Sequence, residues 1–167
     1  SLTAPNGQAQ HGLLTASLAD ASAPVDSFVY QEAHGTGTAL GDPIEAGSFV
    51  SAVLTARSVD ASPVSLCGVK ANIGHTENGA GAPQLLRLLL SSRTDWVVAN
   101  VQLRCLNPHV NMLAVNCALP TQNSRLGAHD ESRCGVSSFG YAGTIAHAVL
   151  RRVDEASDWR EGLSVLR

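Results

Sequence analysis

The chain has 167 residues, 44% of them hydrophobic and only 15% charged, which is enough apolar material for one globular domain and excludes a disordered chain. The 11 Lys and Arg residues oppose 14 Asp and Glu residues, a formal net charge of -3, so the basic footprint of a nucleic-acid-binding protein is absent. The longest apolar stretch, residues 85–90, is interrupted by Arg87 and is far shorter than the roughly 20 residues that cross a bilayer, so no membrane segment is expected.

The cysteines and histidines show no disulfide or metal-binding pattern. No CxxC pair and no HxxxH spacing occurs, and a chain of this length does not need disulfides to support its core. We therefore expect reduced thiols, no metal site and a cytoplasmic location, with an organelle as the alternative. Residues 1–7 carry neither an initiator Met nor a signal peptide, which predicts a piece of a longer protein.

The first predicted elements are a helix over residues 8–21 and a strand over residues 25–33. The helix follows a Pro-Asn-Gly turn and repeats apolar residues at i, i+4 and i+7. The strand is rich in β-branched and aromatic residues and leads directly into the Gly/Thr loop 34–38. His34 is therefore expected at the end of a strand.

A second helix is predicted from Pro43 to about Arg57. Asp42 is placed to serve as its N-cap, and Glu45 at the third helical position completes a capping box. We interpret both acidic residues as scaffold that positions the loop 34–38.

The pattern of strand and loop histidine then repeats. Residues 64–75 form a short apolar strand that ends in a glycine and His75. Residues 76–92 have the length and apolar content of a buried helix, within which Pro83 marks a late start or a kink.

The remaining predicted elements are short. Between residues 95 and 129 we expect loops with edge strands at 96–101 and 110–117. A strand from Cys134 leads into a glycine-rich turn at 140–144, and a final apolar strand covers 145–153. The alternation of strands and helices predicts a layered α/β fold, and Cys67 and Cys134 in apolar strands are expected to be buried hydrophobes.

Three loops of similar composition follow apolar strands, at residues 34–38, 74–79 and 140–144, so a layered α/β fold brings their tips to one edge of the sheet. Neutral imidazoles donate hydrogen bonds to a developing enolate or oxyanion, and a nearby Lys70 disfavours their protonation. The combination favours carbonyl chemistry on an acyl group. From spacing alone, His34 and His75 serve equally well as structural loop residues, and Lys70 as a surface lysine.

The chain carries four motifs in order: EAHGTGT at 32–38, GDPIE at 41–45, VKANIGHTE at 69–77 and GVSSFG at 135–140. Together they strongly resemble the C-terminal half of the β-ketoacyl synthase (ketosynthase) domain of modular polyketide synthases and type I fatty acid synthases. The resemblance implies half of a thiolase-like αβαβα layered fold over residues 1–153, incomplete without its N-terminal half, and a polar tail or linker over 154–167. The residues in these motifs resemble those of polyketide synthases more than those of fatty acid synthases.

The resemblance implies decarboxylative condensation of a cysteine-bound acyl chain with a malonyl unit on acyl carrier protein. His34 and His75 would be the catalytic histidines, which hydrogen-bond the malonyl thioester carbonyl and stabilise the enolate. Lys70 would organise the site electrostatically. Thr36 and Thr38 would bind the phosphopantetheine arm of the carrier protein, the only cofactor-like group expected, and Phe139, Gly140 and Tyr141 would form a gating turn.

Two departures from the family pattern leave alternatives open. The nucleophilic cysteine of the family lies in its N-terminal half, so this chain alone is expected to be inactive and to work with that half in a homodimer. Ile145 stands where the family usually has Asn. The alternatives are a non-catalytic partner that resembles a chain-length factor or scaffold, and a thiolase-fold relative that binds acyl-CoA.

Overall fold

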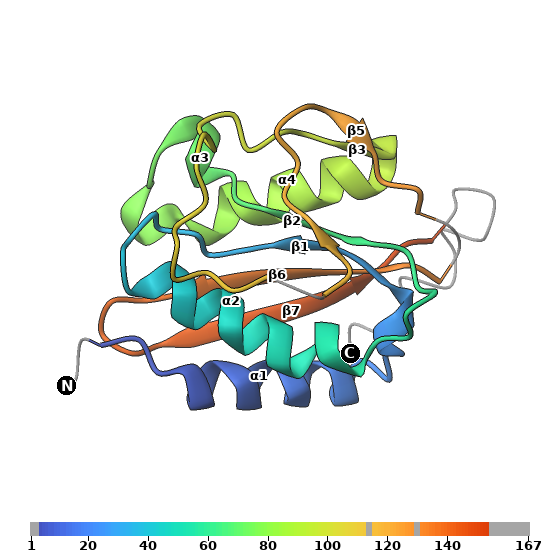
Figure 1. The fold of residues 1–167 in the computed structure, drawn as a ribbon, viewed down its shortest axis with the longest axis horizontal. Coiled ribbons are helices and arrows are strands. Elements are labelled where there is room, and N and C mark those ends of the chain that lie inside the picture. Colours follow the sequence, from blue (N-terminus) through green and yellow to red (C-terminus); the bar gives the residue numbers. More distant parts are fainter. Residues whose placement is uncertain (1–3, 113–114, 129–130, 154–167) are drawn as a thin grey trace, which may run out of the picture.

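A five-stranded sheet forms the centre of the molecule, with the strand order β4-β2-β1-β6-β7 (Figure 1). The computed structural model describes residues 4–112, 115–128 and 131–153. The sheet strands are β1 (Phe28–Glu32), β2 (Val64–Cys67), β4 (Cys117–Ala118), β6 (Arg133–Phe139) and β7 (Ile145–Arg151). β4, β2, β1 and β6 run parallel, whereas β7 pairs antiparallel with β6. A separate antiparallel pair joins β3 (Trp96–Val97) to β5 (Ser124–Arg125).

Helices cover both faces of this sheet, which confirms the predicted α/β class. α1 (Gly7–Asp20) and α2 (Gly41–Ala52) lie on one face, and α3 (Lys70–Ile73) and α4 (Gly81–Thr94) lie on the other (Figure 1). Short 3-10 turns occur at η1 (Val25–Ser27), η2 (Leu54–Ala56) and η3 (Glu77–Gly79).

Each face of the sheet has its own apolar core. On the α1 and α2 side, Leu14, Phe28 and Phe49 belong to one buried cluster. On the α4 side, Tyr30 and Leu88 belong to a second cluster. All five residues of β1 are buried because the strand lies between these two layers, and the burial of apolar side chains on both faces stabilises the sheet.

The beginning of α2 differs from the prediction. The helix starts at Gly41, and the Thr38 hydroxyl accepts a hydrogen bond from the Gly41 N–H at 3.0 Å, so Asp42 is not the N-cap. The side chain of Asp42 instead accepts from the Gly37 N–H at 3.1 Å. The helix also ends early, at Ala52, where the chain tightens into η2.

The predicted strand over residues 64–75 is wrong in its second half. β2 ends at Cys67, and the chain then forms the helical turn α3, which Gly74 ends with a φ of +80°. His75 is therefore presented by the turn after α3 rather than by a strand end. Glycine suits this position because the left-handed region lacks a Cβ penalty only for glycine.

The later elements are shorter than predicted. Helix α4 starts at Gly81, which confirms the late start at Pro83, because a proline in the first helical turn removes no intrahelical hydrogen bond. Of the expected edge strands at 96–101 and 110–117, the described residues form only β3 and, at the end of the second, the two-residue β4. Residues 113–114 and the predicted tail 154–167 lie outside the described residues.

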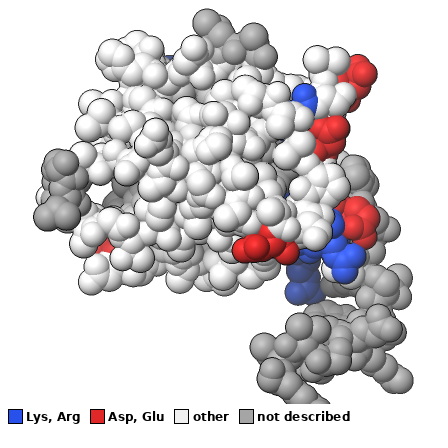
Figure 2. Space-filling view, turned by 90° about the horizontal axis from the view of Figure 1, so that it is seen from below, with Lys and Arg blue, Asp and Glu red and all other residues white. Residues whose placement is uncertain are grey.

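The face formed by α1 and α2 carries few charges. Figure 2 shows charged side chains gathered mainly at one end of this face, away from the loops that follow β1 and β2. Among residues 4–112, 115–128 and 131–153, no helix combines the length and apolar character that a membrane crossing requires.

Gly135 in β6 leaves no room for a side chain. A Cβ at this position would lie 2.4 Å from Gln31 Oε1, 2.5 Å from Phe28 Cζ and 2.8 Å from His147 Cε1. We expect Gly135→Ala to lower the free energy of unfolding by about 1–3 kcal/mol, because three buried groups must shift. Urea denaturation measures the loss. Gly47→Ala, at an open position in α2, is the matched control and should not destabilise.

Candidate active site

The carboxyl ends of the parallel strands bring the predicted loops together at one edge of the sheet. His34 follows β1, Lys70 and His75 follow β2, and Phe139 ends β6. The ring centroids of His34 and His75 lie 5.7 Å apart with an interplanar angle of 88°, and the Phe139 ring lies 5.5 Å from His34. The structure therefore places the two predicted histidines side by side, with one predicted gating residue packed against them.

The environment of His34 keeps its imidazole neutral. Burial lowers the pKa of His34 to about 4, and the nearby Lys70 and His75 also act to lower it. Its Nδ1 is buried and has no hydrogen-bond partner within the described part of the chain. The position of the ring is therefore set by its packing and by its backbone.

His75 is held in one tautomer. Its Nδ1 accepts a hydrogen bond from the Glu77 N–H at 2.8 Å, so the ring proton lies on Nε2. The side chain is exposed at the edge of the sheet. His75 is thereby prepared to donate a hydrogen bond from Nε2 to an oxygen atom in the site.

Lys70 brings positive charge to the same edge. Its Nζ is buried and has no hydrogen-bond partner among the described residues. Burial lowers the pKa of Lys70, while the carboxylates of Glu45 and Glu32 act in the opposite direction. An ammonium group held near two neutral imidazoles favours negative charge that develops on a bound oxygen.

Two buried glutamates hold the backbone of the two histidine-bearing loops. Glu45 accepts hydrogen bonds from the His34 and Gly35 N–H groups, at 2.7 Å and 2.9 Å. Glu32 accepts from the Val69 N–H at 2.5 Å, one residue before Lys70. The scaffold interpretation of Glu45 is thus confirmed, although its partner is the loop itself and not the N-terminus of its own helix. Glu32 was not predicted as a site residue, and its place as an acidic residue at the end of an apolar strand was the available signal.

The remaining predicted site residues differ in their placement. Thr36 and Thr38 share a hydroxyl contact at 3.3 Å, and Thr36 lines the cavity described below. In the turn after β6, the Gly140 N–H donates to the Thr144 carbonyl at 2.6 Å. Tyr141 is 84% exposed in this turn and is not among the residues that line the cavity.

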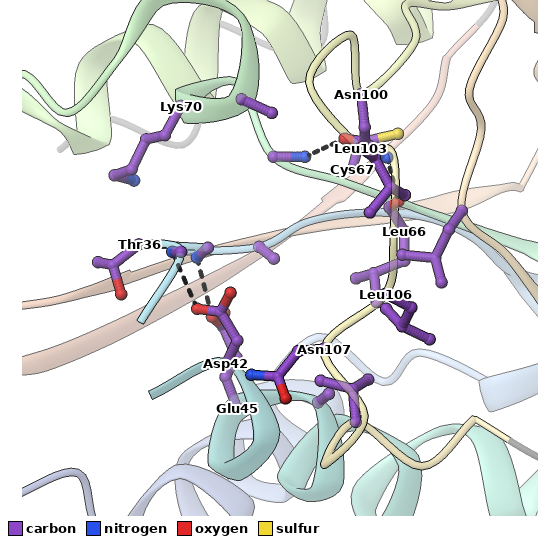
Figure 3. Close-up of a pocket in the computed structure, with 18 of the residues that line it drawn as sticks. Thr36, Asp42, Glu45, Leu66, Cys67, Lys70, Asn100, Leu103, Leu106 and Asn107 are labelled. Carbon is purple, nitrogen blue, oxygen red and sulfur yellow. Dashed lines mark hydrogen bonds between the residues drawn. The ribbon is translucent and has the colours of Figure 1, made fainter. Parts of the chain in front are cut away.

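A cavity of about 710 Å³ opens beside this cluster. Its polar lining includes Thr36, Asp42, Glu45 and Lys70, whereas its deeper wall is apolar and comes from α2, β2 and residues 102–110 (Figure 3). Asn100 fixes this last segment to β2, because its side chain accepts from the Gly68 N–H at 2.9 Å and donates to the Leu66 carbonyl at 3.2 Å. No role was predicted for this segment, which has no periodic pattern.

His147, Cys67 and Cys134 have environments that differ from those of His34 and His75, although Cys67 lines the adjoining cavity. Burial lowers the pKa of His147 to about 4, and its Nδ1 lies 3.0 Å from the Ser137 hydroxyl, while its Nε2 has no partner within the described residues. Burial raises the pKa of the Cys67 and Cys134 thiols to about 12, which makes them poor nucleophiles. No set of three His, Cys, Asp or Glu residues in the described ranges is arranged to hold a metal ion.

Comparison with known proteins identifies the family. The model of the β-ketoacyl synthase C-terminal domain matches residues 1–104. One component of the phenolphthiocerol/phthiocerol polyketide synthase of Mycobacterium tuberculosis is 36% identical over 157 residues, which are 93% of this chain and 9% of that protein. Highly reducing polyketide synthase 40 from Fusarium pseudograminearum is 36% identical over 92% of this chain and 6% of that protein.

Solved ketosynthases share the fold. The oxazolomycin ketosynthase domain from Streptomyces albus superposes with a TM-score of 0.82 at 33% identity, covering 91% of this chain and 27% of that chain. The ketosynthase from module 6 of the bacillaene synthase of Bacillus subtilis gives a TM-score of 0.85 at 30% identity, covering 93% and 28%. The chain thus spans only about a quarter of the solved ketosynthase chains. It belongs to the β-ketoacyl synthase family, and it corresponds to the C-terminal part of a polyketide synthase ketosynthase domain.

Proposed function

We propose that this chain supplies the decarboxylation half of a ketosynthase active site, which joins an acyl thioester to a malonyl unit carried by acyl carrier protein. One observation carries the proposal: the ring centroids of His34 and His75 lie edge to face at 5.7 Å, beside a cavity that His75 and Lys70 line. Two neutral imidazoles and one ammonium group match the charge that the reaction develops on the malonyl thioester oxygen.

The proposed reaction uses these groups as hydrogen-bond donors. The bond between the malonyl α-carbon and its carboxylate breaks, carbon dioxide leaves, and the electron pair forms an enolate. His75 donates from Nε2 to the enolate oxygen, since its Nδ1 is occupied by the Glu77 N–H. His34 donates to the same oxygen. The α-carbon then attacks the acyl thioester carbonyl, the new carbon–carbon bond forms and the cysteine thiolate leaves.

Thr36, Thr38 and the turn 139–141 are proposed to receive the phosphopantetheine arm of the carrier protein. The two hydroxyls lie within 3.3 Å of each other at the exposed edge, and Thr36 lines the cavity. Phe139 packs on His34 and connects the turn to the reacting groups. The chain needs no tightly bound cofactor for this chemistry.

The nucleophilic cysteine is proposed to come from the N-terminal half of the same domain, within a homodimer. An apolar surface on α4 supports such a covering partner, because the helix buries the polar Gln84 and Arg87 against the sheet and exposes leucines. Four leucines form this surface, namely Leu85, Leu86, Leu89 and Leu90, which are 38–62% exposed. Exposed leucines in a row indicate a surface that another element covers.

An assay of the complete domain tests the proposal. With the N-terminal half present, malonyl-acyl carrier protein should release carbon dioxide and yield a condensed product with an acyl-primed enzyme. A domain that has its cysteine and both histidines but neither decarboxylates nor condenses this substrate would identify the non-catalytic alternative. Acyl transfer from acyl-CoA but not from acyl carrier protein would identify the second alternative, a free-standing thiolase-fold relative.

A further inference from the structure

The loop that carries His34 is held by a side chain from a different element. Glu45 lies in the second turn of α2, is only 9% exposed and has both carboxylate oxygens engaged. Oε1 accepts from the His34 N–H. Oε2 accepts from the Gly35 N–H (Figure 3). Both N–H groups lie in a stretch where Gly35 adopts a φ of +50°, so the chain makes a sharp bend at this point. The carboxylate satisfies two backbone donors that the bend leaves without a sheet partner.

The imidazole of His34 lacks a side-chain anchor of its own. Its Nδ1 makes no hydrogen bond within the described residues, and its ring contacts are the rings of His75 and Phe139. The orientation of the ring beside His75 therefore depends on the placement of its backbone. Glu45 fixes this backbone from one side by accepting from the His34 N–H, and Gln84 donates to the Ala33 carbonyl of the same peptide group.

We propose that Glu45 is a positioning residue, whose ionised carboxylate holds His34 through two backbone N–H groups in the orientation that meets His75. This inference rests on the proposed function, because it assigns the residue to the same site. Only the carboxylate accepts both hydrogen bonds, since a protonated carboxyl or an amide presents one donor and one acceptor. Loss of either bond frees the bend at Gly35 and lets the imidazole leave its position.

The burial and the charges around Glu45 make its two hydrogen bonds to the loop sensitive to acid. Burial raises the pKa of Glu45 to about 7, and the neighbouring Asp42 carboxylate acts in the same direction, whereas the backbone hydrogen bonds and Lys70 oppose the rise. His34 itself, with a pKa lowered to about 4, stays neutral through the same range. As the pH falls through 7, Glu45 in the folded protein gains a proton, whereas in the unfolded chain it gains one only near its ordinary pKa of 4.5. Protonation removes the cost of burying the charge, but it weakens the hydrogen bonds that hold the loop 34–38.

The test compares variants of the complete ketosynthase domain by carbon dioxide release from malonyl-acyl carrier protein. We expect Glu45→Gln to lower the rate roughly 10- to 100-fold, the loss of one charge-assisted hydrogen bond. The rate of the unmodified domain should fall between pH 8 and pH 5.5, and Glu45→Gln should flatten this acid limb. Asp60→Asn, an exposed carboxylate away from the site, is the matched control and should keep both the rate and the pH profile.

The His34→Ala background distinguishes positioning from general support of the fold. If Glu45 acts through His34, then Glu45→Gln should change the rate of the His34→Ala domain by less than about twofold. An equal loss in both backgrounds, or a wild-type rate and pH profile in Glu45→Gln, would overturn the inference. If Glu45→Gln does not fold, the rate of Glu45→Asp is compared in the same two backgrounds. A full rate in His34→Ala itself overturns the proposed function instead.

Discussion

Replacement of His34 or His75 by alanine is expected to lower carbon dioxide release from malonyl-acyl carrier protein roughly 100- to 1,000-fold in the complete domain. In the proposed mechanism each imidazole offers a hydrogen bond to the same developing oxyanion, and such donors contribute most to the transition state in a site shielded from water. The centroids of the two rings lie 5.7 Å apart, which places both imidazoles at one site. Single-turnover measurement of carbon dioxide isolates this step from acyl transfer.

The variant His75→Gln tests whether a hydrogen-bond donor at this position is what matters. The amide nitrogen of His75→Gln takes a place near the original Nε2, so this variant should keep more activity than His75→Ala. His11 on α1 is not among the residues that line the cavity, so His11→Ala is the control and should retain the wild-type rate. Full carbon dioxide release from both alanine variants would contradict the assigned roles and favour a non-catalytic partner. Loss of acyl loading alone would instead place the histidines in the first half-reaction.

The layered fold was predictable because the local sequence indicates where its main strands lie. β1 begins with Phe28, Val29 and Tyr30, and β6 contains Val136 and Phe139; both strands run into glycine-rich loops, and parallel strands send such loops to one edge. The meeting of His34 with His75 followed from this rule. The helical turn α3 was missed because its four residues have no helical period, and Gly74 that ends it resembles a strand-terminal glycine.

Side-chain partners across elements were harder to predict. Glu45 matched a capping box by spacing, yet its carboxylate bonds to a loop 10 and 11 residues earlier, a pairing set by the tertiary approach of α2 to β1. Glu32 stands in an apolar strand with no marker of its partners. Asn100 and the cavity wall that it holds belong to a segment without periodicity, where only the folded chain reveals the contacts.

Glu32 and Arg87 form a buried ion pair whose loss should destabilise the fold more than any other single change considered. Glu32 is 0% exposed and Arg87 is 7% exposed, and Arg87 Nε lies 3.7 Å from Glu32 Oε2. Burial raises the pKa of Glu32, and the charge of Arg87 and the hydroxyl of Tyr30 oppose this rise. We expect Arg87→Met to cost about 3–5 kcal/mol of unfolding free energy, because it leaves a buried carboxylate without its counter-charge. Urea denaturation of the complete domain measures the loss.

The loss of unfolding free energy caused by Arg87→Met should depend on pH, which gives a second test of this prediction. Without the guanidinium, the pKa of Glu32 in the folded protein rises further above its unfolded value, so the folded state takes up a proton as the pH falls and part of the loss is recovered. The deficit should therefore be smaller at pH 5.5 than at pH 8. The double variant Glu32→Gln/Arg87→Met should be less destabilised than the sum of the two single variants, since no charge is left buried. A deficit that is independent of pH, together with additive single effects, would show that Arg87 contributes by its packing on the sheet and its hydrogen bond to the Val98 carbonyl, and not as the counter-charge of Glu32.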